Sequence, residues 1–144
     1  VNSRLQPLQA IVAMHGLKYL NGIITKRNKN AKILDDQLSK IKNVKIPRRI
    51  KNNIETFSLY MGLFEDRDNL MNYLIKNKIE AKIHYPIPLH LQKASKSLKY
   101  SIGSFPIAEQ QAKNLLTLPV HQYLNTKHML YIIKKIKEFY INQG

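Results

Sequence analysis

A helical repeat runs through residues 4–41 and constrains the fold more than any other feature of this 144-residue sequence. Asn21-Gly22 interrupts the repeat, which predicts a helix in two pieces. The portion AIVAMHGL is apolar on more than one side, so it needs covering from more than one direction. We expect upstream chain or a partner subunit to cover it, and otherwise an exposed apolar patch. The repeat is formed by Leu5, Leu8, Val12, His15, Tyr19, Ile24, Ala31, Leu34, Leu38 and Ile41.

Shorter elements are predicted after Pro47, which breaks the helical pattern. The segments with the length and composition of strands are 43–46, 56–64 and 79–86. Helix start and stop signals favour helices over 66–77, 91–98, 105–116 and 126–141. Asp66 is the expected N-cap of the first of these, and the sequence LLTLP is expected to end the third.

This order of elements predicts a small two-layer α+β domain with a sheet built on residues 57–64 and 79–85. The helices should pack their apolar stripes on that sheet. Those stripes consist of Leu70, Tyr73 and Leu74, then Ala108, Ala112 and Leu115, and finally Met129, Ile133, Ile136 and Tyr140.

The formal net charge of +15 is typical of proteins that bind nucleic acid or another acidic surface. The excess is mostly lysine, however, scattered over segments such as KIKNVK, and charge runs of this kind are usually solvated faces. We therefore expect no nucleic-acid partner. Cysteine is absent and the five histidines lack the spacing of a metal site, so we also expect no metal.

No apolar run approaches the roughly 20 residues that a membrane span needs. The sequence begins without methionine and without the pattern of a secretory signal, so we expect a segment of a longer chain. There is no glycine-rich phosphate loop, no nucleophile elbow and no evident pair of general acid and base. We assign no catalytic residue to the sequence.

The stretch HYPIPLH, residues 84–90, has a restricted backbone. Pro86 and Pro88 each fix φ near about −65° and favour extended geometry in the preceding residue. His84 and Tyr85 should therefore stand at a strand end, and His90 should follow on a short rigid arch. Such side chains can donate hydrogen bonds to phosphate or hydroxyl oxygens at low ordering cost. We expect His84, Tyr85 and His90 to cluster at one edge of the domain, with polar tips that solvent or a ligand can reach. Alternatively, both histidines only satisfy local carbonyls beside a packed tyrosine.

The first residues of the chain present a similar choice. Asn2 and Arg4 lie just ahead of the long helix, where their donors and the helix N-terminus could hold an anion together. Alternatively, Asn2 or Ser3 is only the N-cap of that helix.

Taken together, these segments resemble the C-terminal part of the DegT/StrS-type sugar aminotransferases, pyridoxal-phosphate enzymes of the aspartate-aminotransferase fold. The succession of HYPIPLH, FPIAE and LTLP is specific to that family. The matching segments run in order along nearly the whole chain: NSRLQPLQAIVAMHGLKYL, KRNKNAKILDDQL, LYMGLFEDRDNLMNYL, IEAKIHYPIPLHLQ, FPIAEQQAKNLLTLPVHQYL and YIIKKIKEFY. The resemblance implies that residues 1–41 are an interdomain helix region, that residues 42–144 are the small C-terminal domain, and that the large coenzyme-binding domain is absent from this sequence.

The resemblance also implies a function, namely transfer of an amino group from glutamate to a nucleotide-linked keto-sugar in amino-sugar or cell-surface polysaccharide biosynthesis. It implies a cytoplasmic homodimer that holds pyridoxal phosphate at the subunit interface. Asn2 and Arg4 match the N-x-R motif, which reaches the coenzyme phosphate or nearby anionic groups of the neighbouring subunit. His84, Tyr85 and His90 match residues that line the nucleotide-sugar pocket. Ser58 departs from the family, because many relatives carry histidine there.

The family's Schiff-base lysine, and the aspartate that pairs with the pyridinium nitrogen, have no counterpart in this sequence. We therefore expect the 144-residue chain alone to be inactive. Two other interpretations stay open: a basic binding module for an anionic polymer or partner, and a remnant that only dimerises. A lysine-bearing strand and loop upstream would favour the enzyme, whereas a steep salt dependence of nucleic-acid affinity would favour the binding module.

Overall fold

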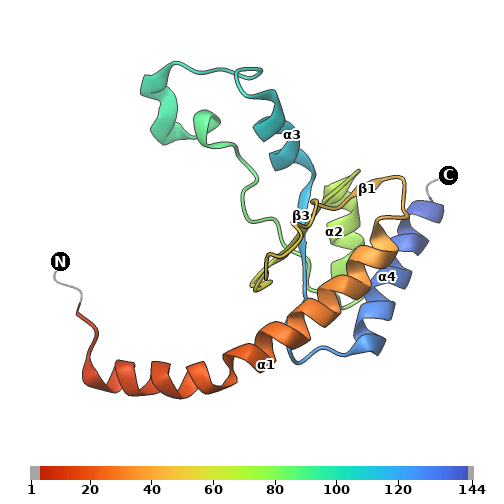
Figure 1. The fold of residues 1–144 in the computed structure, drawn as a ribbon. Coiled ribbons are helices and arrows are strands. Elements are labelled where there is room, and N and C mark those ends of the chain that lie inside the picture. The colour runs from red at the N-terminus through yellow and green to blue at the C-terminus, as the bar shows by residue number, and fades with distance from the viewer. Residues whose placement is uncertain (1–3, 143–144) are drawn as a thin grey trace.

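The computed structural model of the protein describes residues 4–142, which form one long helix followed by a small layered unit (Figure 1). Its sheet has three antiparallel strands in the order β1-β2-β3, so β2 is central. Helices α1 and α4 lie side by side, and α2 contacts α4, β2 and β3. The predicted small α+β unit is confirmed. Its elements are α1 (Pro7–Leu38), β1 (Val44–Lys45), β2 (Tyr60–Phe64), α2 (Arg67–Lys76), η1 (Leu89–Leu91), η2 (Lys93–Leu98), α3 (Pro106–Asn114), β3 (Leu115–Leu118) and α4 (Thr126–Ile141).

The core forms around β2 because alternate side chains of a strand point to the same face. Tyr60, Gly62 and Phe64 are buried on this face, and Met61 and Leu63 are half-buried on the other. The predicted stripes of α2 and α4 are confirmed, with Tyr73 and Tyr140 half-buried at their edges. The other elements bury Ala31, Leu34 and Leu38 of α1, Leu70 and Leu74 of α2, Leu116 and Leu118 of β3, and Met129, Ile133 and Ile136 of α4.

The helix α1 is continuous, so the prediction of two pieces is wrong. A Cβ at Gly22 would meet nothing within 4 Å, and the helical hydrogen bonds run through the glycine without a break. The Thr25 hydroxyl donates to the Asn21 carbonyl at 2.9 Å, a pattern that often bends helices, and α1 curves along its length in Figure 1. The weak point in the sequence therefore produces a curve and not an end.

The caps of the helices are partly as predicted. Asn125 caps α4, since its side chain accepts the His128 N–H at 3.2 Å while the His128 ring accepts the Asn125 N–H. Asp66 does occupy the N-cap position of α2. Its φ is 49°, however, and its carboxylate accepts the Asn69 side chain in place of a helix N–H.

The predicted strand over 79–86 is wrong, and so is the assignment of LLTLP to the end of a helix. The third strand of the sheet is β3, formed by LLTL, and it pairs with β2 from Tyr60–Leu118 to Leu63–Leu115. Lys82 alone pairs with β3, through an isolated bridge to Thr117. Pro86 and Pro88 provide no N–H for a ladder, which limits the extension of this segment along β3. Ala108 is exposed, so α3 buries only Ala112.

Candidate functional site

The segment that leads into HYPIPLH is fixed to the sheet at Lys82. Two backbone hydrogen bonds, at 3.1 and 2.9 Å, join Lys82 to Thr117. In extended chain, alternate side chains share a face. Ala81 is therefore buried, whereas Glu80, Lys82 and His84 lie on the outside.

His84 lines a hollow of about 190 Å³ at this edge of the sheet, as the sequence predicted for a group reachable by solvent. Lys82 forms an ion pair with Glu80 beside it. Thr117 is buried, and its hydroxyl has no hydrogen-bond partner within residues 4–142. The hollow thus combines an exposed imidazole with a paired lysine and glutamate, while the threonine hydroxyl lies buried beneath them. Its further lining residues include Ser58 and His121.

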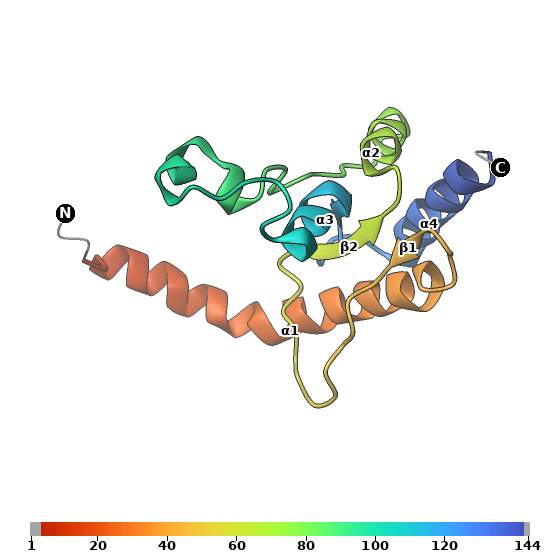
Figure 2. The ribbon, with the colours of Figure 1, turned by 90° about the horizontal axis from the view of Figure 1, so that it is seen from above.

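Residues 86–105, which we call the lobe, stand away from α2 and α4 (Figures 1 and 2). Tyr85, which immediately precedes the lobe, is 69% exposed, as expected for a group that solvent or a ligand can reach. The His90 ring is different, since its side chain is only 7% exposed and its Nε2 lies 2.9 Å from Glu109 Oε1. The prediction that the polar tip of His90 would be reachable is therefore wrong for Nε2.

Glu109 lies in the first turn of α3 and joins the lobe to that helix through hydrogen bonds. Its carboxylate accepts the Gly103 N–H at 2.9 and 3.0 Å, the Phe105 N–H at 3.2 Å, and the His90 ring. Gly103 has φ of +90°, a backbone conformation that glycine adopts without strain. The Gly103 N–H lowers the pKa of Glu109 most, partial burial opposes the shift, and the Phe105 N–H and His90 lower it further.

An aromatic cluster completes the lobe. The His90 and Phe105 ring centroids are 4.9 Å apart, and those of Tyr100 and Phe105 are 5.0 Å apart. His84 and His90 belong to the same excursion of the chain, but no hydrogen bond, ion pair or ring contact joins them within the described residues. The lobe therefore orders His90 separately from the hollow that His84 lines.

Arg4 is exposed and precedes the first turn of α1, whereas Asn2 lies outside the described residues. The helix begins later than expected: its N-cap is Gln6, whose N–H donates to Gln9 Oε1 at 2.9 Å. The alternative that Asn2 or Ser3 is the N-cap is therefore wrong. Residues 7–22, which we call the arm, contain no buried side chain, and the arm projects to the same side of the molecule as the lobe (Figures 1 and 2).

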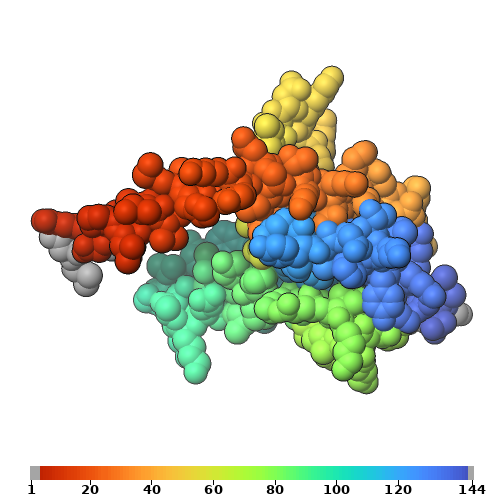
Figure 3. Space-filling model, turned by 90° about the horizontal axis from the view of Figure 1, so that it is seen from below, coloured from red at the N-terminus to blue at the C-terminus, as the bar shows by residue number. Residues whose placement is uncertain are grey.

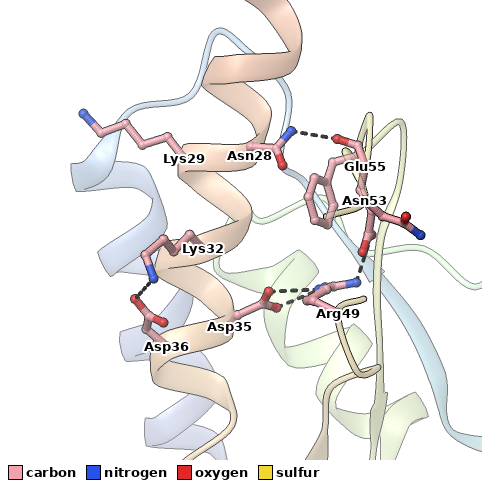
Figure 4. Close-up of a pocket in the computed structure, with 9 residues that line it drawn as sticks. Asn28, Lys29, Lys32, Asp35, Asp36, Arg49, Asn53 and Glu55 are labelled. Atoms are coloured by element: carbon pink, nitrogen blue, oxygen red, sulfur yellow. Dashed lines mark hydrogen bonds and ion pairs between the residues drawn. The ribbon is translucent and has the colours of Figure 1, made fainter. Parts of the chain in front are cut away.

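A larger hollow of about 550 Å³ lies between α1 and residues 46–57, a loop that protrudes in Figures 2 and 3. Figure 4 shows Arg49 paired with two carboxylates and Lys32 paired with Asp36, whereas Lys29 points away from them. Arg49 makes two hydrogen bonds of 3.0 Å to Asp35 and one of 3.1 Å to Glu55. The bond to Asp35 raises the pKa of Arg49 despite its partial burial. Tyr60 donates to Asp35 at 2.7 Å.

The ion pairs of Arg49 along this hollow join the loop to α1. The hollow does not fit an aldehyde cofactor with a phosphate. Its arginine is already saturated by carboxylates. Lys32 on its rim is 77% exposed and lies 3.5 Å from Asp36. Arg49 and Tyr60 lie 14 and 25 residues after Asp35 in the sequence. Local spacing therefore did not reveal the cluster that these three residues form.

The described residues limit what else the chain can bind. Residues 4–142 contain no group of three or more side chains that could hold a metal ion. No helix in the same range has the length and apolarity needed to cross a membrane. His121 and His128 both line a hollow of about 220 Å³, but each Nδ1 accepts a backbone N–H.

Known proteins resemble this chain along nearly its whole length. It is 32% identical over 143 residues to the pleiotropic regulatory protein of Geobacillus stearothermophilus, with 96% of this chain and 38% of the relative covered. It is 29% identical over 141 residues to the dTDP-3-amino-3,6-dideoxy-alpha-D-galactopyranose transaminase of Aneurinibacillus thermoaerophilus, with coverage of 96% and 38%.

The crystal structure of DesV from S. venezuelae superposes with a TM-score of 0.89 at 29% identity, covering 96% of this chain and 38% of DesV. The chain thus spans just under two-fifths of the length of these relatives. The model of one family, described as DegT/DnrJ/EryC1/StrS aminotransferases, matches residues 1–137. With that match, and with the fold shared with DesV, the chain belongs to the DegT/DnrJ/EryC1/StrS aminotransferase family.

Proposed function

We propose that the chain is the long helix and small C-terminal domain of an enzyme that moves an amino group from glutamate to a nucleotide-linked keto-sugar. Its membership of the family supports this proposal, and so do relatives that are named as transaminases of dTDP-linked amino sugars. The observation that carries it is the arm, a helix that the chain's own core leaves uncovered on every side. A surface of this kind suits a site shared between domains and subunits.

The candidate residues at the start of the chain and at the edge of the sheet have proposed roles in that shared site. Arg4 and Asn2 hold the coenzyme phosphate or a nearby anion of the neighbouring subunit, because guanidinium and amide groups donate well to phosphate. His84 and Tyr85 contact the nucleotide-sugar from the exposed edge of the sheet. Pyridoxal phosphate supplies the electron sink of the reaction once the complete enzyme holds it. Within residues 4–142, no enclosed lysine site fits this coenzyme, so we propose that the chain alone is inactive.

A hybrid enzyme tests this function. The 144 residues would replace the matching segment of the Aneurinibacillus transaminase, whose remaining sequence would supply the coenzyme lysine. We expect a dimer that aminates a nucleotide keto-sugar with glutamate as the donor. Arg4→Ala should lower kcat/KM at least about tenfold, the scale expected for a charge-assisted phosphate contact. Arg48→Ala, in the protruding loop, is the matched control.

The chain alone, incubated with pyridoxal phosphate, glutamate and the same sugar, should yield no amino-sugar. A folded hybrid dimer without activity would contradict the proposal, and so would turnover by the chain alone.

The net charge and the name of one relative, a pleiotropic regulatory protein, favour a second candidate, a basic binding module. Such a module would bind nucleic acid with an affinity that falls steeply with salt concentration. Titration of the chain with duplex DNA over a range of salt concentrations separates the two candidates. We expect only weak binding that lacks sequence preference.

A further inference from the structure

The ladder between β2 and β3 ends beside the hollow of about 190 Å³ at the edge of the sheet. Its last pair at this end is Tyr60–Leu118, so three positions further a continued register would place Phe57 opposite His121. Ser58 from the first segment and His121 from the second both line the hollow. Backbone pairing therefore does not fix these two sides of the hollow relative to each other, and another contact has to do so.

The chain leaves the ladder at Phe57, whose φ is 45°. Bulky residues rarely adopt this left-handed conformation, so the surrounding contacts must hold it, and such strain gathers at functional sites. The Phe57 ring is 8% exposed, and the Arg49 guanidinium lies 4.9 Å from its centroid. These contacts hold the ring, whereas the Phe57 carbonyl is held by Arg27.

Arg27 of α1 joins the two sides of the hollow. Its Nε donates to Gln122 Oε1 at 3.0 Å, and its Nη1 donates to the Phe57 carbonyl at 3.4 Å. Gln122 follows His121 directly, and Asn30, one turn further along α1, donates to the His121 carbonyl at 3.2 Å. Arg27 makes no ion pair within residues 4–142, so these neutral oxygens are its partners. The arginine thus links the two segments where the ladder does not.

We propose that Arg27 is a positioning residue, which holds Ser58 and His121 at the spacing that the nucleotide-sugar requires in this hollow. The assignment of the nucleotide-sugar rests on the proposed function, whereas the bridge rests on the contacts of Arg27 alone. Arg27 does not line the hollow. It acts instead through the Phe57 carbonyl, next to Ser58, and through the side chain of Gln122, next to His121.

Three substitutions separate the bridge from the charge of the arginine and from its packing. Arg27→Met keeps an apolar stem and removes both donors. Arg27→Lys keeps the charge, but a single ammonium group cannot stand at the positions of both Nε and Nη1. Gln122→Leu removes one acceptor and leaves the arginine in place. Lys29→Met is the matched control, because Lys29 is an exposed cation of the same helix that makes no hydrogen bond or ion pair within residues 4–142.

Backbone ¹⁵N relaxation of the labelled 144-residue chain measures the effect of the bridge on the hollow. The order parameters of Ser58 and Leu59 should fall from about 0.85 in the native chain to about 0.6 in Arg27→Met. Arg27→Lys and Gln122→Leu should lower them as well, whereas Lys29→Met should not. Unchanged order parameters in Arg27→Met, or native values in Arg27→Lys, would overturn the positioning role.

The hybrid enzyme tests whether this position matters for the nucleotide-sugar. Arg27→Met should raise KM for the nucleotide keto-sugar about tenfold with little change in kcat, because it loosens a binding surface and removes no reacting group. Gln122→Leu should show the same split between KM and kcat, and Lys29→Met should change neither constant. If Arg27 served packing alone, urea denaturation would show a loss of stability while KM stayed the same. That outcome in an active hybrid would overturn the role in binding, whereas an inactive native hybrid would contradict the proposed function.

Discussion

The two halves of α1 follow the same helical pattern but are stabilised in different ways. Ala31, Leu34 and Leu38 in the second half are at most 1% exposed and belong to the core. In the arm, Ile11 and Val12 are 63% and 66% exposed and contact nothing in the core. Short helices are marginal in water without packing, so the arm depends on its continuity with the packed half and on whatever covers it in an assembly. The comparison shows where this chain folds by itself and where it needs another surface.

The largest expected loss of stability comes from a cavity in the packed half of α1. Leu34→Ala removes a side chain that is 0% exposed and should lower the free energy of unfolding by about 2–5 kcal/mol. Ile11→Ala, the matched change in the arm, should alter it by no more than about 0.5 kcal/mol. Urea denaturation of dilute protein measures both. Similar losses in the two variants would mean that the arm is packed in solution.

The second prediction concerns the cluster that fastens the protruding loop to the packed half of α1. Tyr60→Phe removes the hydroxyl that donates to Asp35 at 2.7 Å, a hydrogen bond to a charged group. Its loss should cost about 1.5–3 kcal/mol in the same denaturation experiment. Tyr123→Phe is the control, because Tyr123 is 82% exposed. A Tyr60→Phe variant as stable as the native chain would show that the cluster contributes nothing to stability.

The third prediction concerns self-association of the chain through the arm. If the arm meets a second copy of the chain, Ile11→Lys places a charge in an apolar interface and should weaken self-association about tenfold or more. The free energy of unfolding of the dilute monomer should hardly change. Sedimentation velocity over a range of concentrations measures the association. Ile54→Lys in the protruding loop, at an 82% exposed position, is the control. A native chain that stays monomeric at every concentration would contradict association through the arm.

The sequence predicted the elements whose signals are local. Asn125 and the apolar spacing after it define α4, and the exposed apolar face of the arm was evident from AIVAMHGL. The strand β3 was missed because LLTL follows α3 without a turn, and only its pairing with β2 distinguishes it from a helix end. Extended geometry was correctly expected at Lys82, but the ladder there stops after a single bridge.

The candidate site was predicted in part for the same reason. His84 and Tyr85 are exposed, as expected for groups that solvent or a ligand can reach. The contact of His90 with Glu109 spans 19 residues and could not be seen from local spacing. One signal was present, since residues 81–108 contain no aspartate or glutamate, which leaves Glu109 as the first carboxylate after the lobe. A lone acid beside a basic and aromatic segment is a candidate partner for its histidine.

The smallest effect expected is a shift in the acid titration of the lobe. Hydrogen bonds from Gly103, Phe105 and His90 hold the pKa of Glu109 below its ordinary value of 4.5. The folded lobe therefore binds this proton less readily than the unfolded chain. The stabilisation is fully present above the ordinary pKa and is lost as the pH falls through the lower pKa of the folded state. The amide shifts of Gly103 and Phe105 should titrate together with a midpoint below 4.5.

Glu138 is the internal reference for that titration, because Lys135 lowers its pKa by a side-chain hydrogen bond and not by backbone N–H groups. High salt screens exposed ion pairs but has little effect on hydrogen bonds from the backbone. Raising the salt concentration should therefore move the midpoint of Glu138 towards its ordinary value and leave that of Glu109 nearly unchanged. A titration midpoint of Glu109 at or above 4.5, or one that changes with salt as much as that of Glu138, would contradict this prediction. The lobe in solution would then lack the hydrogen bonds from the Gly103 and Phe105 N–H groups to Glu109.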